Sequence, residues 1–435
     1  MRRKTRTYRW VFLLTNLLIL FSTQLWLHRD WNALLVMKVS LLNLLIFAGI
    51  YAFRGLDFRP TRNINETVVS YALGSLAGML IALIPMLSLP GPRLGTIPMV
   101  VTFFFSALVS PFLFHGLIRT IIRFIPPERL LIIGKQEELE PMMKEVQAQS
   151  LGKVQVYAYI NPSEPLLEQT LEQSQAFDSI IIGDPHLTAG IETLLRKARQ
   201  NQISVDFLPK IVESHLKRIP LELIAKFEEY YEISFSHPNN SPAKRIMDLF
   251  LALFLIIVTS PIMILLYILI PLDSGFPILF RHTRMGFKNQ PFSFLKFRSL
   301  TTIEAEELEQ EQNPNQTIHQ RLTKIGRVIR KLRFDEFPQF FNVLANTMSM
   351  IGPRPEMIQY HTLCEQNIPY YQYRNNLKPG ITGWAQIHYK HTTTLSDYKT
   401  KTEYDLYYIK NRNIFLDLQI ALQTVETMFG MRGSR

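Results

Sequence analysis

The sequence predicts a membrane protein built from three parts. These are an α-helical four-span bundle, a small α/β domain of Rossmann type, and a mostly α-helical third part that begins with a re-entrant membrane helix. Three patterns support this prediction: four apolar stretches in the first quarter, short apolar runs alternating with polar helical segments in the second, and a fifth apolar run interrupted by Ser260-Pro261. The predicted boundaries are 1–125, 126–235 and 241–435, with the re-entrant helix at 246–270.

Each of the four apolar stretches is about long enough to cross a hydrocarbon core of roughly 30 Å as a helix. The stretches are Trp10 to Leu27, Leu34 to Phe53, Val68 to Leu89 and Thr96 to Ile118. Arginines precede the first stretch, separate the second from the third and follow the fourth, whereas the opposite loops carry only Arg29 and Arg93. The positive-inside rule therefore predicts a multi-pass protein whose residues after 120 face the cytoplasm.

The segment between Glu128 and Tyr231 alternates short apolar runs with polar helical ones, which predicts a parallel sheet. Strands are predicted at Arg129–Gly134, Val154–Ile160, Ser179–Gly183 and Ser204–Leu208, and helices at Glu137–Ala148 and Gly190–Gln200. The first strand ends at Gly134, but the Gly-x-Gly-x-x-Gly fingerprint of a dinucleotide site does not follow it. A structural or regulatory module is the default prediction, and a nucleotide site is the alternative.

The fifth apolar run, Ile246 to Ile270, is long enough to cross a membrane, yet positive charge lies on both of its flanks. Pro261 in mid-segment removes a backbone donor and is expected to bend the helix. A hairpin-like re-entrant helix that enters and leaves on the cytoplasmic face explains both features, and a straight fifth span is the alternative. At its start, Asp248 is expected to pair with Arg245 or to meet backbone donors at the helix N-terminus.

The composition favours anionic partners. Lys+Arg number 47 and Asp+Glu 36, a formal net charge of +11. Because the cations cluster beside apolar segments, anionic lipids of the membrane and diphosphates are favoured as partners over nucleic acid. The single cysteine, Cys364, excludes an internal disulfide and a multi-cysteine metal site. We interpret it as a small buried apolar residue.

Two adjacent carboxylates, Asp335 and Glu336, stand between Phe334 and Phe337, directly after a helix rich in Lys and Arg. Buried neighbouring carboxylates repel one another, so arginines such as Arg333, a Mg²⁺ ion held by the two acids, or both must compensate. In this hypothesis Asp335 is a nucleophile that accepts a phosphoryl group and releases a nucleoside monophosphate, Glu336 helps to hold Mg²⁺, and Arg333 binds phosphate.

Further cations are expected at the same pocket. In the strand-like segment Phe292–Ser299, Lys296 and Arg298 would share one face and form a diphosphate-sized site, with a basic membrane-surface patch as the alternative. In Gly352-Pro353-Arg354-Pro355 the prolines fix the backbone, so Arg354 is prepared to bind a phosphate bidentately. Residues 378–384 form a second rigid turn, which either lies near this pocket or is a purely structural turn.

The segment from Ser241 to Arg432 resembles the bacterial sugar transferase family of polyprenyl-phosphate phosphoglycosyl transferases. The resemblance rests on several motifs in order: Lys244-Arg245 with Asp248, Ser260-Pro261, Lys296-Phe297-Arg298-Ser299, Asp335-Glu336-Phe337-Pro338-Gln339 with Asn342-Val343, Met348 to Pro355, and Pro379 to Gly383. The four N-terminal spans and the Rossmann-like domain match the family's long form. Two departures are Phe337 in place of the usual leucine and Ala345-Asn346-Thr347 in place of Arg/Lys-Gly-Asp.

The resemblance implies a monotopic catalytic core on a helix kinked at Ser260-Pro261, at the cytoplasmic face of the bacterial inner membrane. It implies that Asp335 becomes phosphoglycosylated by a UDP-sugar, such as UDP-glucose or UDP-galactose, and that undecaprenyl phosphate then attacks. UMP and a polyprenyl-diphosphate sugar are the implied products, Mg²⁺ is required, and exopolysaccharide, capsule or O-antigen assembly begins. A homodimer is compatible with the long form.

Two other readings stay open at this point. A membrane-anchored nucleotide-sugar dehydratase could share the four spans and the Rossmann-like domain, but no tyrosine has a lysine four residues later, as its Tyr-x-x-x-Lys pair requires. A non-catalytic membrane scaffold of polysaccharide assembly would explain the basic surface. It would leave the conjunction of Asp335-Glu336, Arg354 and Lys296 unexplained.

Overall fold

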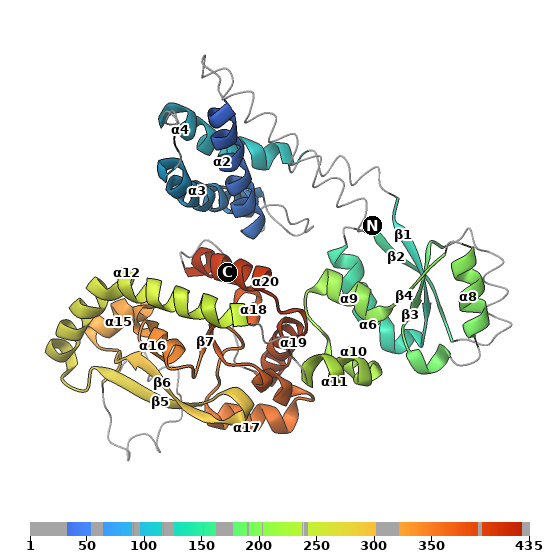
Figure 1. Cartoon of the computed structure of the whole chain (residues 1–435). Helices are drawn as coiled ribbons and strands as arrows, with labels where there is room; N and C mark the ends of the chain where they lie inside the picture. The colour runs from blue at the N-terminus through green and yellow to red at the C-terminus, as the bar shows by residue number, and fades with distance from the viewer. Residues whose placement is uncertain are drawn as a thin grey trace. The chain divides into compact units, whose positions relative to one another are not determined.

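The computed structural model describes residues 33–53, 64–88, 90, 96–114, 116, 126–150, 152–161, 177–188, 191–201, 203–236, 238, 242–301, 322–389 and 394–428. The described chain is mostly helical and divides into two compact units (Figure 1). Residues Met1–Lys217 and Val425–Arg435 form the first unit, and Arg218–Thr424 the second. The first predicted span, Trp10 to Leu27, lies outside the described residues.

Apolar helices open the first unit. Helix α2 (Ala33–Ala52), helix α3 (Ile64–Ser88) and helix α4 (Thr96–Phe104), which runs on into the π-helix η1 (Phe105–Val109), occupy the second, third and fourth predicted spans. Among the described residues, two helices of the chain are long and apolar enough to cross a membrane: α2 and, in the second unit, α12 (Pro242–Ser274). Ser70–Leu83 and Met99–Phe114 are shorter apolar helical stretches. These helices support a membrane protein.

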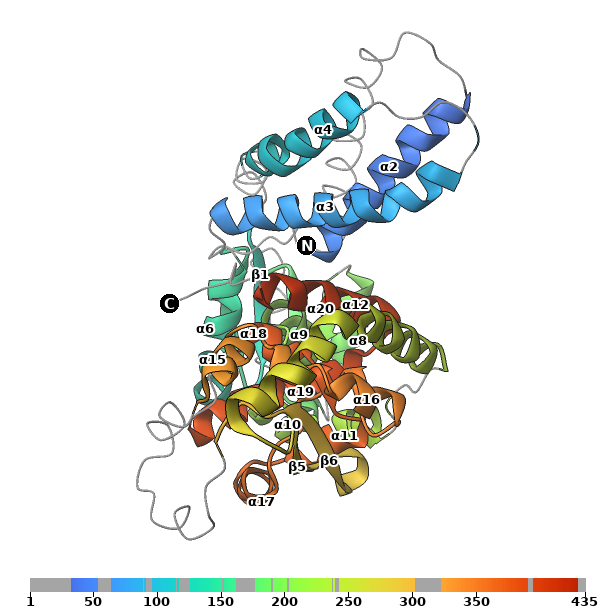
Figure 2. The same cartoon turned by 90° about the vertical axis from the view of Figure 1, so that its left-hand side faces the viewer.

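Glycines let α2 and α3 cross closely, as Figure 2 shows. A Cβ added to Gly49 of α2 would lie 2.0 Å from the carbonyl oxygen of Gly74 in α3. A Cβ added to Gly78, one helical turn further on, would lie 2.4 Å from the Leu45 oxygen. Only glycine leaves room for this approach of two backbones, and small residues spaced by four are typical of helix contacts in membranes.

A four-stranded parallel sheet follows in the first unit, in the order β2-β1-β3-β4. Its strands are β1 (Glu128–Ile133), β2 (Val154–Ile160), β3 (Ser179–Ile182) and β4 (Ser204–Phe207), with α6 (Gln136–Gln149), η2 (Pro185–Thr188), α8 (Glu192–Gln200) and α9 (Leu208–Leu216) between and after them. Helix α8 covers one face, and α6 and α9 the other (Figure 1). The predicted strands and helices are confirmed here to within two residues at each end.

The carboxyl ends of β1 and β3 are closed by one side chain, Leu139 of α6. A Cβ added to Gly134, after β1, would lie 2.5 Å from Leu139 Cδ1, and one added to Gly183, after β3, would lie 2.4 Å from the same atom. In doubly wound sheets ligands bind where the strand order reverses, which here is between β1 and β3. The leucine fills the space where a phosphate would approach, which favours the structural module over the nucleotide site.

The second unit contains short helices around two small sheets. In chain order its elements are α10 (Leu221–Lys226), α11 (Glu228–Ser236), α12, β5 (Leu279–Met285), η3 (Phe287–Asn289), β6 (Pro291–Phe297), α15 (Lys324–Lys331), η4 (Phe334–Glu336), α16 (Gln339–Leu344), β7 (Ser349–Ile351), α17 (Ile358–Asn367), η5 (Tyr371–Asn376), β8 (Gly380–Thr382), α18 (Trp384–His388), α19 (Leu395–Asn411) and α20 (Ile414–Met428). Strands β5 and β6 pair antiparallel, and β7 and β8 pair parallel. Helices α10 and α11 pack in this unit, although the sequence-based boundaries assign them to the α/β domain.

Helix α12 has 33 residues and includes Pro261 without ending there. The proline has no N–H to donate to the carbonyl of Ile257 four residues earlier. The Ser260 hydroxyl donates to that carbonyl instead, at 2.8 Å. Large apolar side chains along the middle of the helix, Phe250, Phe254, Ile257, Val258 and Ile264 among them, are more than half exposed. A continuous apolar surface of this kind needs a partner such as lipid.

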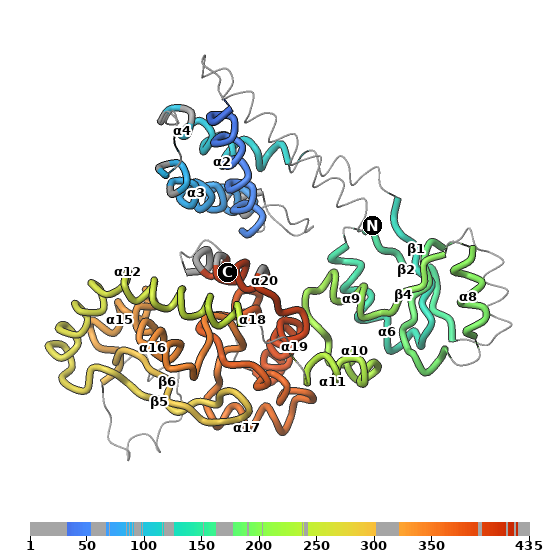
Figure 3. Tube along the Cα trace, in the orientation of Figure 1, coloured from blue at the N-terminus to red at the C-terminus, as the bar shows by residue number. Residues whose placement is uncertain are grey.

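Both ends of α12 are bound to other elements of the second unit. Figure 3 traces the chain from α12 into the β5–β6 hairpin. Near its start, Asp248 accepts from the backbone N–H of Met350 in β7 at 3.1 Å. Near its end, Asp273 Oδ2 accepts from the backbone N–H of Ile325 in α15 at 2.8 Å. The exposed middle of the helix thus lies between two anchored ends.

Candidate active site

The predicted acid pair lies on a single turn, η4, between α15 and α16. Arg333 directly before it has φ 62° and ψ 17°, a left-handed conformation that few residues other than glycine adopt. This reverses the chain and turns Asp335 inward, where only 5% of the residue is exposed. The ring of Phe334 packs at a tilt against that of Phe337, with ring centroids 5.0 Å apart, and so fixes the turn to the chain just before α16. The prediction that aromatic neighbours keep the pair from full exposure is confirmed.

Lys296 bridges the two acids from strand β6. Its Nζ donates to Asp335 Oδ2 at 3.3 Å and to Glu336 Oε1 at 3.0 Å. Asn342 of α16 fixes the strand, since its amide donates to the Ser293 carbonyl at 2.7 Å and accepts from the Leu295 N–H at 3.1 Å. The lysine and the acids are therefore held by one connected backbone framework.

Two arginines complete the pocket around Glu336. Arg354 Nη2 donates to Glu336 Oε1 at 2.9 Å, and Arg333 Nη1 lies 3.6 Å from the same oxygen. The Arg333 side chain is 60% exposed, whereas that of Arg354 is 20% exposed. Burial alone would raise the pKa of Glu336, but the cations beside it, Arg354 first and then Lys296, lower it well below its usual range. Glu336 is therefore ionised at neutral pH.

The turn that carries Arg354 is joined to the second predicted turn, as expected. The backbone N–H of Gly352 donates to the Thr382 carbonyl at 2.9 Å, beside the parallel pair of β7 and β8. A Cβ added to Gly380 would lie 2.1 Å from the Gly352 nitrogen, and one added to Gly383 2.2 Å from the Gly352 oxygen. Glycine is required at these positions because the two turns touch through their backbones.

Arg298 does not belong to this pocket, and the prediction that it shares a phosphate site with Lys296 is wrong. Strand β6 ends at Phe297, so the alternation that predicted a shared face stops before Arg298. The Arg298 guanidinium donates to the carbonyls of Ser274, Gly275 and Phe276, at the C-terminal end of α12. These helix-end carbonyls have no helical donor, so a buried cation is well placed there. Arg298 anchors the C-terminal end of α12.

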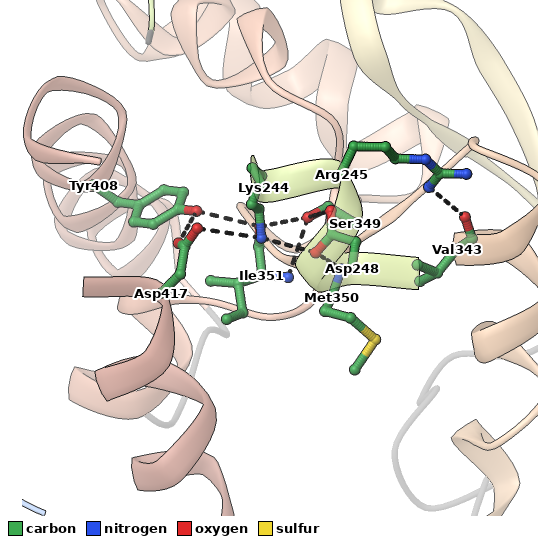
Figure 4. Close-up of polar contacts among 9 residues, drawn as sticks. All are labelled: Lys244, Arg245, Asp248, Val343, Ser349, Met350, Ile351, Tyr408 and Asp417. Atoms are coloured by element: carbon green, nitrogen blue, oxygen red, sulfur yellow. Dashed lines mark hydrogen bonds and ion pairs between the residues drawn. The ribbon is translucent and has the colours of Figure 1, made fainter. Parts of the chain in front are cut away.

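The polar residues at the start of α12 form a second, closed cluster (Figure 4). Lys244 Nζ lies 2.9 Å from Asp248 Oδ1 and 3.3 Å from Asp417 Oδ2 of α20. Asp248 also accepts from the Ser349 hydroxyl at 2.8 Å, and Asp417 from the Tyr408 hydroxyl at 2.6 Å. The predicted pairing of Asp248 with Arg245 is wrong, because Lys244, one helical turn before Asp248, occupies that position. The backbone donor that Asp248 meets, Met350, comes from β7 and not from the helix N-terminus.

Arg245 serves a different purpose. Its guanidinium donates to the Val343 carbonyl at 2.8 Å (Figure 4). It also donates to the Leu344 carbonyl at 3.2 Å, at the end of α16. It thereby joins the start of the membrane helix to the helix that follows the acid pair. Ser260 and Pro261 stand apart from the acid pair in sequence and element, in the exposed middle of α12.

Several residues that build these two sites were missed by the sequence analysis. Asn342 was recognised only as part of a motif, and Asp417 was not singled out. The polar character of Asp417 within the apolar run Ile414–Met428 is a signal that could have found it, since a carboxylate on an apolar helix needs a buried partner.

The carboxylates of Asp335 and Glu336 are the candidate ligands for Mg²⁺. Among the residues that the structure describes, no three His, Cys, Asp or Glu side chains gather into a group that could hold a metal ion by themselves. Mg²⁺, however, usually binds through one or two carboxylates together with substrate phosphates and water. Asp335 and Glu336 share the cation of Lys296 and supply such a pair. The residues fit an ion that binds together with a diphosphate.

The pocket combines a carboxylate able to act as a nucleophile with cations that exceed the acids in number. Asp335 Oδ2 is held by Lys296, while its Oδ1 makes no hydrogen bond within the described residues. Three cations, Lys296, Arg354 and Arg333, surround two carboxylates. Such an arrangement binds anionic oxygens and stabilises charge that develops on them, as phosphoryl transfer requires.

Comparison with known proteins identifies the class. Residues 239–431 match the family model described as bacterial sugar transferase. The uncharacterized sugar transferase EpsL of Bacillus subtilis is 38% identical over 192 residues, which cover 44% of this chain and 89% of that protein. The chain belongs to the bacterial sugar transferase family.

Longer relatives share part of their length with this chain. The UDP-N-acetylgalactosamine-undecaprenyl-phosphate N-acetylgalactosaminephosphotransferase of Aeromonas hydrophila is 35% identical over 264 residues, 60% of this chain and 60% of that protein. The UDP-glucose:undecaprenyl-phosphate glucose-1-phosphate transferase of Escherichia coli K12 is 32% identical over 241 residues, 54% of this chain and 51% of that protein. The chain thus spans between half and two thirds of these two relatives.

Proposed function

We propose that this protein transfers a sugar-1-phosphate from a UDP-sugar to undecaprenyl phosphate, with release of UMP. The observation that carries the proposal is the acid pocket: Asp335 and Glu336 beside Lys296, Arg354 and Arg333. Membership of the bacterial sugar transferase family supports the same reaction class, as do the names of the two longer relatives. The product would begin the assembly of an exopolysaccharide, capsule or O-antigen.

The reaction proceeds in two steps at one phosphorus atom. An oxygen of Asp335 attacks the phosphorus that carries the sugar, the bond from this phosphorus to the bridging oxygen breaks, and UMP leaves with the electron pair. A phosphate oxygen of undecaprenyl phosphate then attacks the phosphorus of the sugar-phosphoryl Asp335. The bond to the aspartate oxygen breaks, the Asp335 carboxylate is restored, and the lipid diphosphate sugar is formed. No net oxidation occurs, and covalent catalysis divides a difficult step into two.

The cations of the pocket have separate tasks in these steps. Lys296 holds both acids and so fixes Asp335 for attack, and Arg354 can bind phosphate oxygens with the guanidinium N–H groups that Glu336 does not use. Arg333, the most exposed of the three cations, would contact the diphosphate of the UDP-sugar at the open side of the pocket. Asp335 and Glu336 would hold Mg²⁺, which when bound neutralises charge on the diphosphate.

We further propose that α12 is re-entrant and that the catalytic unit lies on the cytoplasmic face of the bacterial inner membrane. Both ends of the helix are bound to the second unit, through Asp248 and Asp273, while its middle exposes apolar side chains. The exposed cations of α15 face anionic lipids in this arrangement. The N-terminal helices form a multi-pass bundle of four spans, and the parallel sheet is a Rossmann-like domain without a catalytic task.

The experiment that tests the reaction measures UMP release from purified protein, undecaprenyl phosphate, Mg²⁺ and a panel of UDP-sugars. The panel includes UDP-glucose, UDP-galactose and UDP-N-acetylgalactosamine, since the named relatives use different sugars. UMP should be released with at least one member, and Asp335→Asn should reduce the rate by about 10⁴-fold or more. Release of UDP instead of UMP would reject the reaction.

A second measurement addresses the covalent step. Without undecaprenyl phosphate, the intact mass of the protein should increase by one sugar phosphate, and peptide analysis should locate the adduct on Asp335. The Asp335→Asn variant is the matched control and should gain no mass. UMP release that requires undecaprenyl phosphate, with no adduct at any time, would argue for direct transfer in one step.

A further inference from the structure

The turn that carries Arg354 is fixed by hydrogen bonds that its backbone carbonyl groups accept from other parts of the unit. The Pro353 oxygen accepts from the backbone N–H of Gly380 at 2.9 Å. The Glu356 oxygen accepts from the backbone N–H of Met285 at 3.0 Å. These two bonds come from β8 and β5, which lie far apart in the sequence, so the turn is fixed at both ends by separate elements.

The two carbonyls between these ends are bound by side chains. The Arg354 oxygen accepts from Arg374 Nη2 at 3.0 Å, and the Pro355 oxygen accepts from Arg284 Nη1 at 2.6 Å. Four successive carbonyls of this turn therefore each have a donor. Prolines on both sides of Arg354 already restrict the backbone. With the carbonyls bound as well, the turn has few alternative conformations.

Arg374 is itself held in place by buried partners. It lies 2.8 Å from Asp405 Oδ2 and donates to the Tyr371 hydroxyl at 2.7 Å. The side chains of Arg374 and Asp405 are 3% and 1% exposed. Burial opposes the charge of Arg374, but Tyr371 and Asp405 raise the pKa of its guanidinium above its usual value. A fully charged and immobile donor therefore faces the Arg354 carbonyl.

Arg284 is held by an aromatic ring. Its guanidinium lies 4.4 Å from the centroid of Phe294, which shares a strand with Lys296. Burial, and then the neighbouring charge of Arg354, lower the pKa of Arg284 to about 10, so it still carries its charge at neutral pH. A planar guanidinium can stack on the ring and donate to a carbonyl at once, which a lysine ammonium cannot do equally well.

On the basis of the proposed function, we propose that Arg374 and Arg284 are positioning residues for Arg354. They hold the carbonyls of Arg354 and Pro355 so that the Arg354 guanidinium meets the transferring phosphate in one orientation, and neither touches the substrate. Donors that are fixed before substrate binds lose little entropy and need little reorganisation during the reaction. Asp405 supports this through Arg374.

A double-mutant cycle separates positioning from a merely structural role. The probe is UDP, and its binding is measured by isothermal titration calorimetry to protein that carries Asp335→Asn and cannot turn over. Arg374→Lys should weaken UDP binding about tenfold when Arg354 is present and less than twofold when Arg354→Lys is also present. Equal losses in both backgrounds, or no UDP binding in any background, would overturn the proposal.

Two further variants keep the test decisive. Arg284→Lys removes the guanidinium that donates to the Pro355 carbonyl, next to that of Arg354. It should also weaken UDP binding more when Arg354 is present than when Arg354→Lys is present. This variant provides the test if Arg374→Lys does not fold. Arg218→Lys is the matched control, because Arg218 is an arginine of the same unit whose guanidinium donates to the carboxylate of Glu403. It should change the midpoint of thermal unfolding and leave UDP binding unchanged. A loss of binding in this control equal to that in Arg374→Lys would contradict the proposal.

The outcome does not depend on the success of the proposed reaction. If the cycle shows coupling but the native protein releases no UMP, the reaction is wrong and the positioning role stands. If UMP is released and the losses in UDP binding are additive, the reaction stands and the positioning role is wrong.

Discussion

Two lysines in the second unit each bridge a pair of carboxylates, and their surroundings differ. Lys296 joins Asp335 to Glu336 at 3.3 and 3.0 Å, and Lys244 joins Asp248 to Asp417 at 2.9 and 3.3 Å. Around Lys296 two arginines bring the cations to three against two acids. In the described part of the Lys244 cluster, Lys244 bridges its two acids and Arg412 is a further positive charge that acts on Asp417. The Lys296 side chain is 22% exposed and that of Lys244 is 9% exposed.

The remaining hydrogen-bonding capacity of the acids differs as well. In the Lys244 cluster, the hydroxyls of Ser349 and Tyr408 donate to the two carboxylate oxygens that the lysine does not contact, and the Met350 N–H donates to Asp248 Oδ1 beside the lysine. In the acid pocket, Asp335 Oδ1 makes no hydrogen bond within the described residues. The same residue types therefore produce two different structures. In the Lys244 cluster all four carboxylate oxygens have donors, so the cluster acts as an anchor. In the acid pocket positive charge is in excess and Asp335 Oδ1 is available to react.

The largest effect that would test this comparison is expected from Lys244→Met. It removes the cation that bridges two buried carboxylates, and breaking a buried ion pair typically costs about 3–5 kcal/mol. The free energy of unfolding, measured by denaturant titration in detergent, should fall by this amount. Lys296→Met is the matched comparison and should lower it by less, because Lys296 is more exposed than Lys244 and Arg354 still acts on both Glu336 and Asp335. Equal losses in both variants would show that the clusters have the same role.

The next largest effect concerns activity. Arg354→Ala removes a fixed donor from the pocket, and loss of one such donor typically lowers kcat by about 10²–10³-fold. UMP release should fall by this factor while the thermal midpoint stays within a few degrees of the native value. Arg298→Lys provides the contrast, because Arg298 contacts the end of α12 and not the pocket. A loss of UMP release in Arg298→Lys as large as in Arg354→Ala would contradict the assignment.

The two regions should also respond to pH with opposite signs. The neighbouring cations hold the pKa of Glu336 in the folded protein below its value of about 4.3 in the unfolded chain. At pH values between the two, the unfolded chain binds more protons than the folded protein. The contribution of Glu336 to stability is therefore lost as the pH falls from about 4.3 towards the folded pKa. Burial raises the pKa of Asp417 above about 3.9, so its contribution falls as pH rises above that value. Unfolding free energies measured between pH 3 and 7 should lose the first slope in Glu336→Gln and the second in Asp417→Asn. Identical slopes in the two variants would remove this distinction.

The smallest effect is expected at Ser260, outside both clusters. Ser260→Ala removes the hydroxyl that donates to the Ile257 carbonyl, whose usual helical donor is lost because residue 261 is proline, and should lower the free energy of unfolding by about 1 kcal/mol. Thr259→Val is the control. The Thr259 hydroxyl donates to the Leu255 carbonyl, which already has a helical backbone donor, so a smaller loss is expected. A larger loss in Thr259→Val would reject the compensating role of Ser260.

Much of the fold could be predicted because its elements have local signals. Strand β2 was predicted at Val154–Ile160 and has these bounds, since the apolar run has loop residues on both sides. The apolar stretches 34–53 and 246–270 similarly coincide with α2 and α12. The division between units was not predictable in this way, because the packing of α10 and α11 depends on contacts such as that of Arg218 with Glu403.

Part of the candidate site could be predicted, because the chemistry of some residues requires a neighbour of a particular kind. Two adjacent buried acids need cations, and Lys296 and Arg354 supply them. Arg298 was misassigned because a period-two pattern cannot show where a strand ends. Partners chosen by tertiary packing were missed: Lys244 meets Asp417, and Arg374 meets Asp405, without any motif that links them. Sequence spacing also could not distinguish Lys244 from Arg245 as the partner of Asp248.

Strand β6 carries Lys296, which holds the reacting acids, and is followed directly by Arg298, which holds the end of α12. Two residues of extended chain span about 7 Å. The lipid-facing helix and the acids are consequently connected by a short spacer of fixed length. The depth at which the helix settles in the bilayer would then determine how far above the lipid tails the aspartate stands, and with it the height to which a polyprenyl phosphate must rise to react.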